Sequence, residues 1–247
     1  MKTLVYYLLV CTLLFSCKKP ENRSCFKSIG TIVSKEIYLN EFDKLILNEH
    51  LTYTIIQDSA NKVVLTGGKN LLNHVELNLN ENQLLEIKNK NKCNFLRNYK
   101  KKINVEIHLK SLVNIEFIGT DSLKNLGELH VDYFTLVVKD GAGSVKLNVN
   151  AKYVNAIVTG GFGDFTLTGK SDAAKLIVNG NGYCNTKDLQ IKDSLIVISN
   201  SAAPIWINAS NTLFKCQIKN NGDIFYKGSP SKIEFINLGK GNLIQKN

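Results

Sequence analysis

From about residue 113 onward, the sequence repeats with a period near 20 residues. Successive units begin at Phe134, Val154, Ala174, Ser194, Leu213 and Lys232. One glycine recurs among them at intervals of 20, 19, 40 and 19 residues, as Gly143, Gly163, Gly182, Gly222 and Gly241. Such a period is typical of solenoids, in which each circuit of the chain packs on the circuits before and after it. The repeat therefore predicts a coil, and we expect these structural turn glycines to adopt positive φ at its corners.

The apolar residues within each unit alternate as they do in short β-strands. Ile157 and Thr159, followed by Phe165 and Leu167, have a period of two, and no stretch keeps a helical period beyond two turns. Residues 36–112 also alternate, in "VELNLN" and "INVEIHL", but repeat less cleanly. We expect an all-β solenoid with rungs of about 20 residues and a less regular, β-rich N-terminal half. Since no Pro/Ser-rich linker divides the chain, residues 29–247 are expected to form a single domain.

The segment "GFGDFTLTGKS", Gly161 to Ser171, comes close to a phosphate-binding loop, G-x-x-x-x-G-K-[ST]. The motif needs a glycine five residues before Gly169, where this chain has Asp164. It also needs a helix that begins at Lys170, whereas the residues that follow return to a strand pattern. We therefore expect Gly163 to serve the backbone, and no nucleotide or other cofactor is predicted.

Residues 1–16, "MKTLVYYLLVCTLLFS", have the features of an export signal, with one lysine and an apolar run too short for a stop-transfer span. The sequence "LLFSC", which ends at Cys17, resembles the lipobox of bacterial lipoproteins, although Phe15 departs from its commonest form. The resemblance implies cleavage before Cys17 and acylation of its thiol, which would attach the chain to a membrane. An ordinary signal peptide followed by an incidental cysteine is the alternative. Residues 17–28 are expected to form a flexible tether after the lipidated cysteine.

The formal net charge of +10 favours anionic partners such as acidic glycans, lipopolysaccharide phosphates or nucleic acid. Export makes nucleic acid the least expected partner. The excess is spread widely, and its one cluster, residues 97–102, is also what a solvated loop would contain.

Export also permits disulfides. Cys25 and Cys93 both lie in polar, loop-like sequence, and we predict that they pair; Cys184 and Cys216 receive no assignment. No C-x-x-C occurs and the four histidines are scattered, so no metal site is predicted.

Several segments together resemble one bacterial family, described as "putative auto-transporter adhesin, head GIN domain". They are the lipobox, "EFDKLILNEHLTYTIIQ", "NLLNHVELNL", "LLEIKNK", "NNGDIFYKGSP" and "GKGNL". The resemblance implies an exported protein, commonly a lipoprotein of Bacteroidetes-type bacteria, with a right-handed parallel β-helix and no assigned catalytic residues. The chain departs from the pattern at "SNSAAPIW", where alanines and Pro204 replace the glycine turn, so we expect one irregular rung.

The leading functional hypothesis is a non-catalytic lipoprotein of the outer membrane, facing the periplasm or the cell surface. Its solenoid would present evenly spaced side chains to a repetitive or anionic glycan, or to another envelope protein. Tyr183, Trp206 and Tyr226 are the candidate ligand-contacting aromatics, whereas Phe225 is expected to be the buried member of its adjacent pair.

Two alternatives remain open. In the first, the chain would be a structural or assembly protein of the outer membrane. It would be monomeric if the polar residues of the last rung cap the stack, whereas an uncapped end would pair with another copy. Less favoured is a polysaccharide-degrading enzyme. The repeat puts Asp164 and Asp223 three rungs apart, roughly 14 Å at the usual strand spacing. Paired catalytic carboxyls of glycosidases lie about 5 to 9.5 Å apart.

Overall fold

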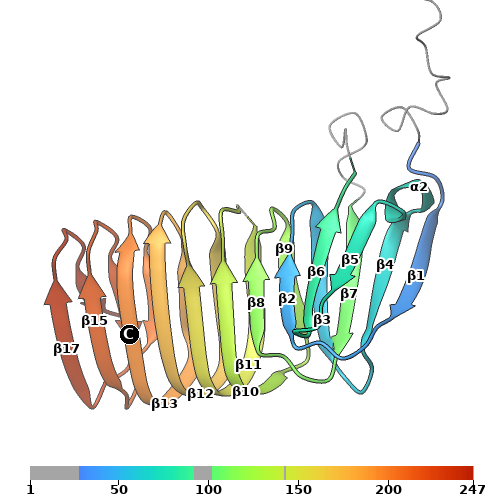
Figure 1. Cartoon of the computed structure of the whole chain (residues 1–247). Helices are drawn as coiled ribbons and strands as arrows, with labels where there is room; N and C mark the ends of the chain where they lie inside the picture. Colours follow the sequence, from blue (N-terminus) through green and yellow to red (C-terminus); the bar gives the residue numbers. More distant parts are fainter. Residues whose placement is uncertain (1–27, 92–101, 142, 247) are drawn as a thin grey trace, which may run out of the picture.

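The computed structural model describes residues 28–91, 102–141 and 143–246, most of which wind into one parallel β-solenoid (Figure 1). The predicted lipid-attachment residue Cys17 and the predicted disulfide partners Cys25 and Cys93 lie outside these residues. So do the export signal and most of the basic cluster.

Strands account for nearly all the regular structure. In the N-terminal half they are β1 (Ile32–Tyr38), β2 (Lys44–Leu47), β3 (Leu51–Gln57), β4 (Lys62–Gly68), β5 (Val75–Leu79), β6 (Leu84–Asn89), β7 (Ile103–Leu109), β8 (Asn114–Phe117) and β9 (Ser122–Leu126), with the short helix α2 (Lys69–Leu72) after β4. In the C-terminal half they are β10 (Leu129–Val138), β11 (Ser144–Val158), β12 (Asp164–Gly180), β13 (Cys184–Ser201), β14 (Ile205–Asn208), β15 (Leu213–Ile218), β16 (Ile224–Lys227), β17 (Lys232–Asn237) and β18 (Leu243–Gln245).

The regular part of the solenoid has three faces, each a parallel sheet that crosses successive rungs. The first face runs from β8 through the ends of β10, β11, β12 and β13 to β15 and β17. The second runs from β9 through the beginnings of β11, β12 and β13 to β14, β16 and β18. The third is shorter and contains the beginning of β10 with the middles of β11, β12 and β13. The three longest strands therefore bend around the whole core.

Inward side chains of successive rungs stack into apolar columns. One column on the first face contains Ile115, Leu136, Ala156, Leu176, Val197 and Cys216, none more than 3% exposed. Each step along it advances the chain by 19 to 21 residues, which confirms the predicted rung length. Burial of a Leu, Ile or Val side chain stabilises a fold by about 1.5–3 kcal/mol. The alternation of apolar residues thus fixes which side of each strand faces the core.

The N-terminal half belongs to the same solenoid, but its rungs do not follow the order of the sequence. β2 lies between β6 and β8, and β3 lies between β7 and β9. The rung formed by residues 44–57 is therefore inserted between two rungs that come later in the chain. Antiparallel strands complete this end: β4 pairs with β7, β1 with β4, and β5 with β6 (Figure 1).

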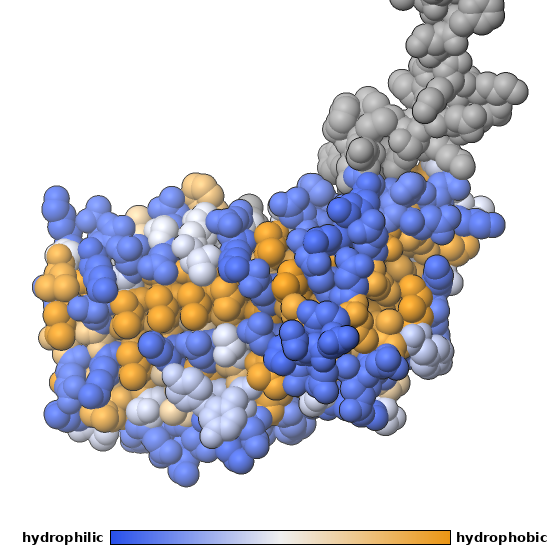
Figure 2. All heavy atoms as spheres, viewed as in Figure 1, coloured by the Kyte–Doolittle hydropathy of each residue, from blue (hydrophilic) through white to orange (hydrophobic). Residues whose placement is uncertain are grey.

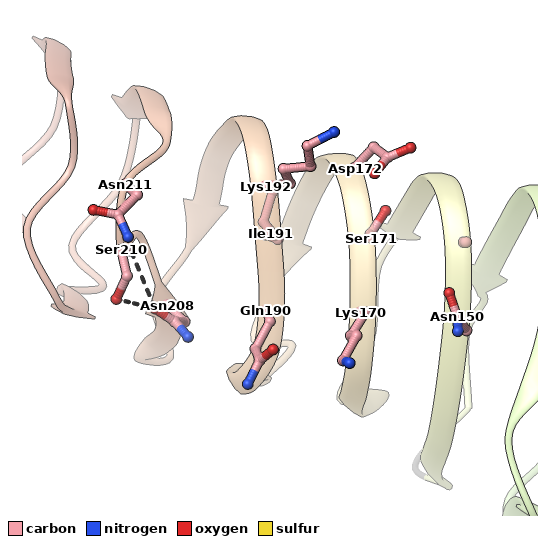
Figure 3. A pocket seen from close by; sticks show the side chains of 11 residues that line it. Asn150, Lys170, Ser171, Asp172, Gln190, Ile191, Lys192, Asn208, Ser210 and Asn211 are labelled. Atoms are coloured by element: carbon pink, nitrogen blue, oxygen red, sulfur yellow. Dashed lines mark hydrogen bonds between the residues drawn. The ribbon is translucent and has the colours of Figure 1, made fainter.

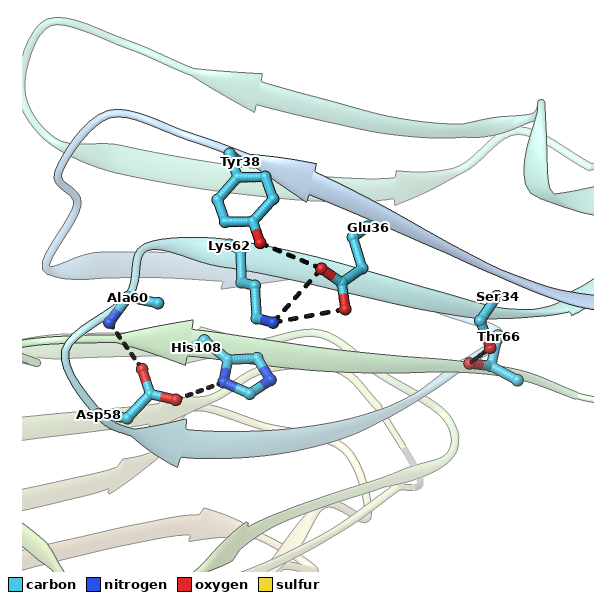
Figure 4. Close-up of polar contacts among 8 residues, drawn as sticks. All are labelled: Ser34, Glu36, Tyr38, Asp58, Ala60, Lys62, Thr66 and His108. Carbon is cyan, nitrogen blue, oxygen red and sulfur yellow. Dashed lines mark hydrogen bonds and ion pairs between the residues drawn. The ribbon is translucent and has the colours of Figure 1, made fainter.

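Polar contacts fix the register of the antiparallel strands at this end (Figure 4). The Lys62 ammonium on β4 lies 3.4 Å from the Glu36 carboxylate on β1, and the Tyr38 hydroxyl donates to the same carboxylate at 3.3 Å. The Asp58 carboxylate lies 2.6 Å from Nδ1 of His108 on β7. This hydrogen bond is the main reason that the pKa of Asp58 falls below its usual range.

The recurring glycines serve the fold for a reason other than the predicted one. None of the five has a positive φ, so that prediction is wrong. A Cβ on Gly222 would lie 2.4 Å from the Ala203 carbonyl oxygen, and one on Gly163 would lie 2.5 Å from a methyl of Val138. The position takes glycine because the preceding rung passes too close for a side chain.

The phosphate-loop candidate is part of a strand. Residues 164–180 form the continuous strand β12, so Lys170 and Ser171 lie in its middle rather than at the start of a helix. This local structure agrees with the prediction that the glycine at 163 serves the backbone.

Candidate binding site

Outward side chains also stack in columns, and one column on the second face is aromatic. Asn185, Trp206, Phe225 and Ile244 follow one another in register. The rings of Trp206 and Phe225 stack with their centroids 4.4 Å apart and their planes 21° apart. The Lys246 ammonium lies 5.7 Å from the Phe225 centroid, within range of a cation–π contact. Parallel pairing brings equivalent positions to about 4.8 Å, which is why aromatic residues one rung apart meet face to face.

A cavity of about 420 Å³ lies beside this column. We call it the aromatic–lysine pocket, and its lining residues are Tyr183, Asn185, Lys187, Trp206, Ile207, Tyr226, Lys227 and Lys246. It contains all three of the aromatic residues singled out from the sequence. The structure therefore brings them into one site, although they come from three successive rungs.

Two adjacent aromatics of β16 point in directions opposite to those predicted. Phe225 is in register with the outward Trp206, whereas Tyr226 is in register with the buried Ile207. The Tyr226 ring packs against Phe214 of the core, 5.8 Å between centroids, while the residue also lines the pocket. The prediction that Phe225 is the buried member of this pair is therefore wrong.

Positive charge dominates the pocket. Three lysines line it, and one of them, Lys227, pairs with Asp188 at 3.3 Å. Within the described chain Lys187 and Lys246 have no carboxylate partner, so both are available to an anionic ligand. Burial raises the pKa of the Tyr183 phenol above its usual value of 10.0, at which it is already a neutral hydrogen-bond donor at neutral pH.

Asp164 lies one rung before Tyr183, at the position in the repeat that the sequence predicts. Its Oδ1 atom is buried and accepts no hydrogen bond from the described residues. Burial raises the pKa of this carboxyl, and the nearby Lys146 partly opposes the effect. The register puts Asp164 and Asp223 three rungs apart, so these two carboxyls do not form the close pair that glycosidases use.

A polar groove lies around the corner, over the third face (Figure 3). It consists of two adjoining hollows of about 560 and 440 Å³ that share Asn150, Ala151 and Asp172. Its outward column contains His130, Asn150, Lys170 and Gln190, one from each rung. At its C-terminal end the Asn208 side-chain oxygen accepts hydrogen bonds from the backbone N–H and hydroxyl of Ser210. The groove offers amides, an imidazole and charges of both signs but no Phe, Tyr or Trp ring.

The first face carries a band of apolar side chains that point outward (Figure 2). Val137, Ile157, Ile177 and Ile198 lie in one register column, all only partly exposed. This column has no charged group that would select an anion. Of the three surfaces, only the aromatic–lysine pocket combines aromatic rings with an excess of positive charge.

The two cysteines in the described part of the chain are core residues without a disulfide. Cys184 lies between Phe165 and Ile205 in one column, and Cys216 follows Val197 in another. Burial raises the pKa of the Cys216 thiol to about 12 and raises that of Cys184 further. Both thiols therefore stay protonated and behave as small apolar side chains.

In the described ranges no three His, Cys, Asp or Glu residues are grouped so that they could hold a metal ion. Nor does the described chain contain a helix with the length and apolar character needed to cross a membrane.

Known structures share the fold. A "putative adhesin" from Bacteroides fragilis superposes with a TM-score of 0.76 and 22% identity, covering 87% of this chain and 97% of that one. A "putative lipid binding protein" from Parabacteroides distasonis gives 0.66 and 18%, covering 88% and 98%. A "putative adhesin" from the same species gives 0.64 and 18%, with the same coverage. At these identities the likeness is one of fold.

No functionally curated protein matches the sequence. A family match spans residues 41–230, which is most of the chain. It includes the strands from β2 to β16 and, with them, the members of the aromatic column up to Phe225. The protein therefore belongs to the family described as "putative auto-transporter adhesin, head GIN domain".

Proposed function

We propose that this chain is an exported, non-catalytic binding protein of the cell envelope, and that its aromatic–lysine pocket binds acidic carbohydrate. The observation that carries the proposal is the convergence of Tyr183, Trp206 and Tyr226 with three lysines on one cavity. Its volume lies in the range usual for small-ligand sites, which bind through aromatic walls and a few placed polar groups.

The chemistry of the lining favours a sugar acid. Electron-rich ring faces attract the weakly positive C–H groups of a sugar ring. Lys187 and Lys246, which have no carboxylate partner among the described residues, supply charge for a carboxylate or sulfate substituent. Asn185 and Tyr183 add neutral hydrogen-bonding groups at the rim. A neutral sugar would leave the lysines unused, so acidic glycans are expected to bind more tightly than neutral ones.

The anchor forms part of the same proposal. Acylation at Cys17 would hold the solenoid at the outer membrane, and residues 18–28 would act as its tether. The adhesin description of the family is consistent with a site that faces the periplasm or the outside of the cell. Mass spectrometry of the mature N-terminus tests the acylation, and protease treatment of intact cells tests the exposure. An unmodified Cys17 would overturn the anchor.

The ligand is tested on an array of acidic and neutral polysaccharides at low salt. The probe is the full chain with Cys17→Ser, which cannot be acylated. We expect binding confined to acidic glycans and weakened by salt. Absence of binding to every acidic glycan, or equal binding to their carboxyl-reduced forms, would overturn the proposal.

Variants locate the site on the chain. At roughly 1 kcal/mol per lost contact, Trp206→Ala should weaken binding about fivefold and the double variant Lys187→Gln/Lys246→Gln about thirtyfold. Lys35→Gln is the matched control, because Lys35 is exposed on β1 at the opposite end of the solenoid. If both pocket variants bind as tightly as the unsubstituted chain, the ligand binds at another site.

A further inference from the structure

The C-terminal end of the solenoid is open. β17 pairs only with β15, and β18 pairs only with β16, so each has one edge whose backbone groups meet no further strand in the described chain. At the other end, antiparallel strands cover the first rungs (Figure 1). An uncovered strand edge is a template for pairing with another chain.

Apolar side chains collect at this open end. Ile233 and Phe235 are 41% and 42% exposed, although the residues below them, Phe214 and Cys216, are buried at 0% and 3%. Ile236 and Leu238, which point elsewhere on the same segment, are 55% and 66% exposed. The sequence-based expectation of a monomer assumed that polar residues cap the stack. Besides its polar residues, the end carries these four exposed apolar side chains, and Figure 2 shows apolar residues at the left edge of the molecule.

From these observations we propose that the open end is a dimer interface, in which β17 pairs antiparallel with β17 of a second copy of this chain. A two-fold axis uses the same surface twice and so closes the assembly at two copies. Head-to-tail stacking would instead set β17 against the antiparallel β1 or β5 edge of the next copy. That arrangement would not continue the inward columns of the core.

Charge selects the register. Lys232, Glu234 and Ile236 point outward on β17, and Ile233 and Phe235 point inward. Residues directly opposite each other across an antiparallel pair point to the same side of the sheet. If the two-fold axis passes through Ile233, the Ile233 side chains of the two copies meet. Lys232 of each copy then lies opposite Glu234 of the other, which gives two symmetric ion pairs. An axis at Glu234 would oppose like charges, and an axis at Phe235 would oppose Glu234 to Ile236.

The dimer does not join the two aromatic columns. Phe225 and Ile244 lie on the second face, whereas the two-fold axis passes through β17 on the first face. Rotation about that axis aligns the second face of one copy with the side of the other copy that carries the third face. The two aromatic–lysine pockets would therefore lie on opposite sides of the assembly, and the interface does not rest on the proposed function.

Sedimentation velocity of the full chain with Cys17→Ser tests the dimer. We expect a reversible dimer whose dissociation constant rises about tenfold or more in Lys232→Glu and in Glu234→Lys, because each change opposes like charges at two symmetric positions. The double reversal Lys232→Glu/Glu234→Lys should restore dimerisation. Lys35→Glu, at the other end, should leave it unchanged. The proposal would be overturned if the chain stays monomeric at concentrations up to about 100 μM. It would also be overturned if neither single charge reversal changes the dissociation constant of the dimer.

A second measurement does not depend on affinity. In the proposed register Ile233→Cys should form an intermolecular disulfide under mild oxidation, because opposite residues of an antiparallel pair lie about 4.5–5.5 Å apart. Ile236→Cys is the matched control, since it is exposed on the same strand but displaced from the axis. The unsubstituted chain gives the background from native cysteines. Equal cross-linking of the two variants, or none from Ile233→Cys, contradicts the register.

Discussion

Replacing Gly222 with alanine should destabilise the solenoid because adjacent rungs lie too close for a methyl group. The added Cβ would lie 2.4 Å from the Ala203 carbonyl oxygen and 2.6 Å from that of Ser201, and both belong to backbone that cannot rotate away. The Gly222 N–H donates to the Ser201 oxygen at 2.9 Å. Any separation of the two rungs that relieves the clash therefore stretches this hydrogen bond.

The expected cost follows from these contacts. Overpacking of this kind costs about 1–3 kcal/mol. A weakened backbone hydrogen bond adds about 0.5–1.5 kcal/mol. The loss is offset by about 0.4–1 kcal/mol, because alanine reduces the conformational entropy of the unfolded chain. The free energy of unfolding should fall by about 2 kcal/mol in total.

Substitutions at two other glycines distinguish the effect of a steric clash from the effect of backbone conformation. Gly160 has no positive φ, and its nearest neighbour would be Asp140 Oδ1 at 3.8 Å, so Gly160→Ala should gain about 0.4–1 kcal/mol. Gly127 has a φ of +74° and open space around it, so Gly127→Ala should lose about 1 kcal/mol through backbone strain alone. Urea unfolding of the three variants measures the differences. Gly222→Ala within about 0.5 kcal/mol of Gly160→Ala would refute the spacing argument.

Three further changes probe the core and its ionisable groups. Leu176→Ala, in the middle of a fully buried column, should lower the free energy of unfolding by about 2–5 kcal/mol in urea titration. Asp164→Asn should raise the free energy of unfolding at pH 7. The pKa of Asp164 is raised in the folded state, so ionisation of this carboxyl destabilises the fold as the pH rises above 3.8. The stabilisation by asparagine should therefore disappear well below pH 3.8. Asp58→Asn should destabilise at neutral pH, because the folded pKa is lowered; that loss should shrink as pH falls below 3.8 through the folded pKa. Thermal unfolding from pH 2 to 7 checks both signs, and a parallel response of the two variants would contradict them.

The regular half of the fold could be predicted because one physical rule repeats in it. Each rung must align its apolar residues with those of the rung below, so the spacing itself reports the pairing partner, as in the step from Ala156 to Leu176. The N-terminal half has no such regularity. Leu45 pairs with Leu85 on one side and with Ile115 on the other, and unequal separations of this kind leave no period in the sequence.

The alternation of apolar residues also fails to predict the structure where it does not determine which of two adjacent side chains points into the core. The pattern at Phe225 and Tyr226 requires one side chain to point inward, but either aromatic residue fits, and the register with Trp206 decides the outcome. The open end escaped prediction for a related reason. Ile233 and Phe235 alternate like any buried pair, and no local signal records that β17 has an unpaired edge in the described chain.

The close approach of adjacent rungs could not be predicted from the sequence either. A recurring glycine indicates a backbone constraint, but sequence alone does not separate a positive φ from a lack of space. Gly127 and Gly222 illustrate the two cases in one chain.

The most direct test of the proposed site is the fluorescence of Trp206, the chain's sole tryptophan. The emission of the full chain with Cys17→Ser is titrated with an acidic oligosaccharide selected from the array, and with its carboxyl-reduced form. We predict a saturable change in Trp206 emission with the acidic form alone, at a midpoint that rises with salt and in Lys187→Gln/Lys246→Gln. Saturable binding that leaves the emission of Trp206 unchanged would contradict the account.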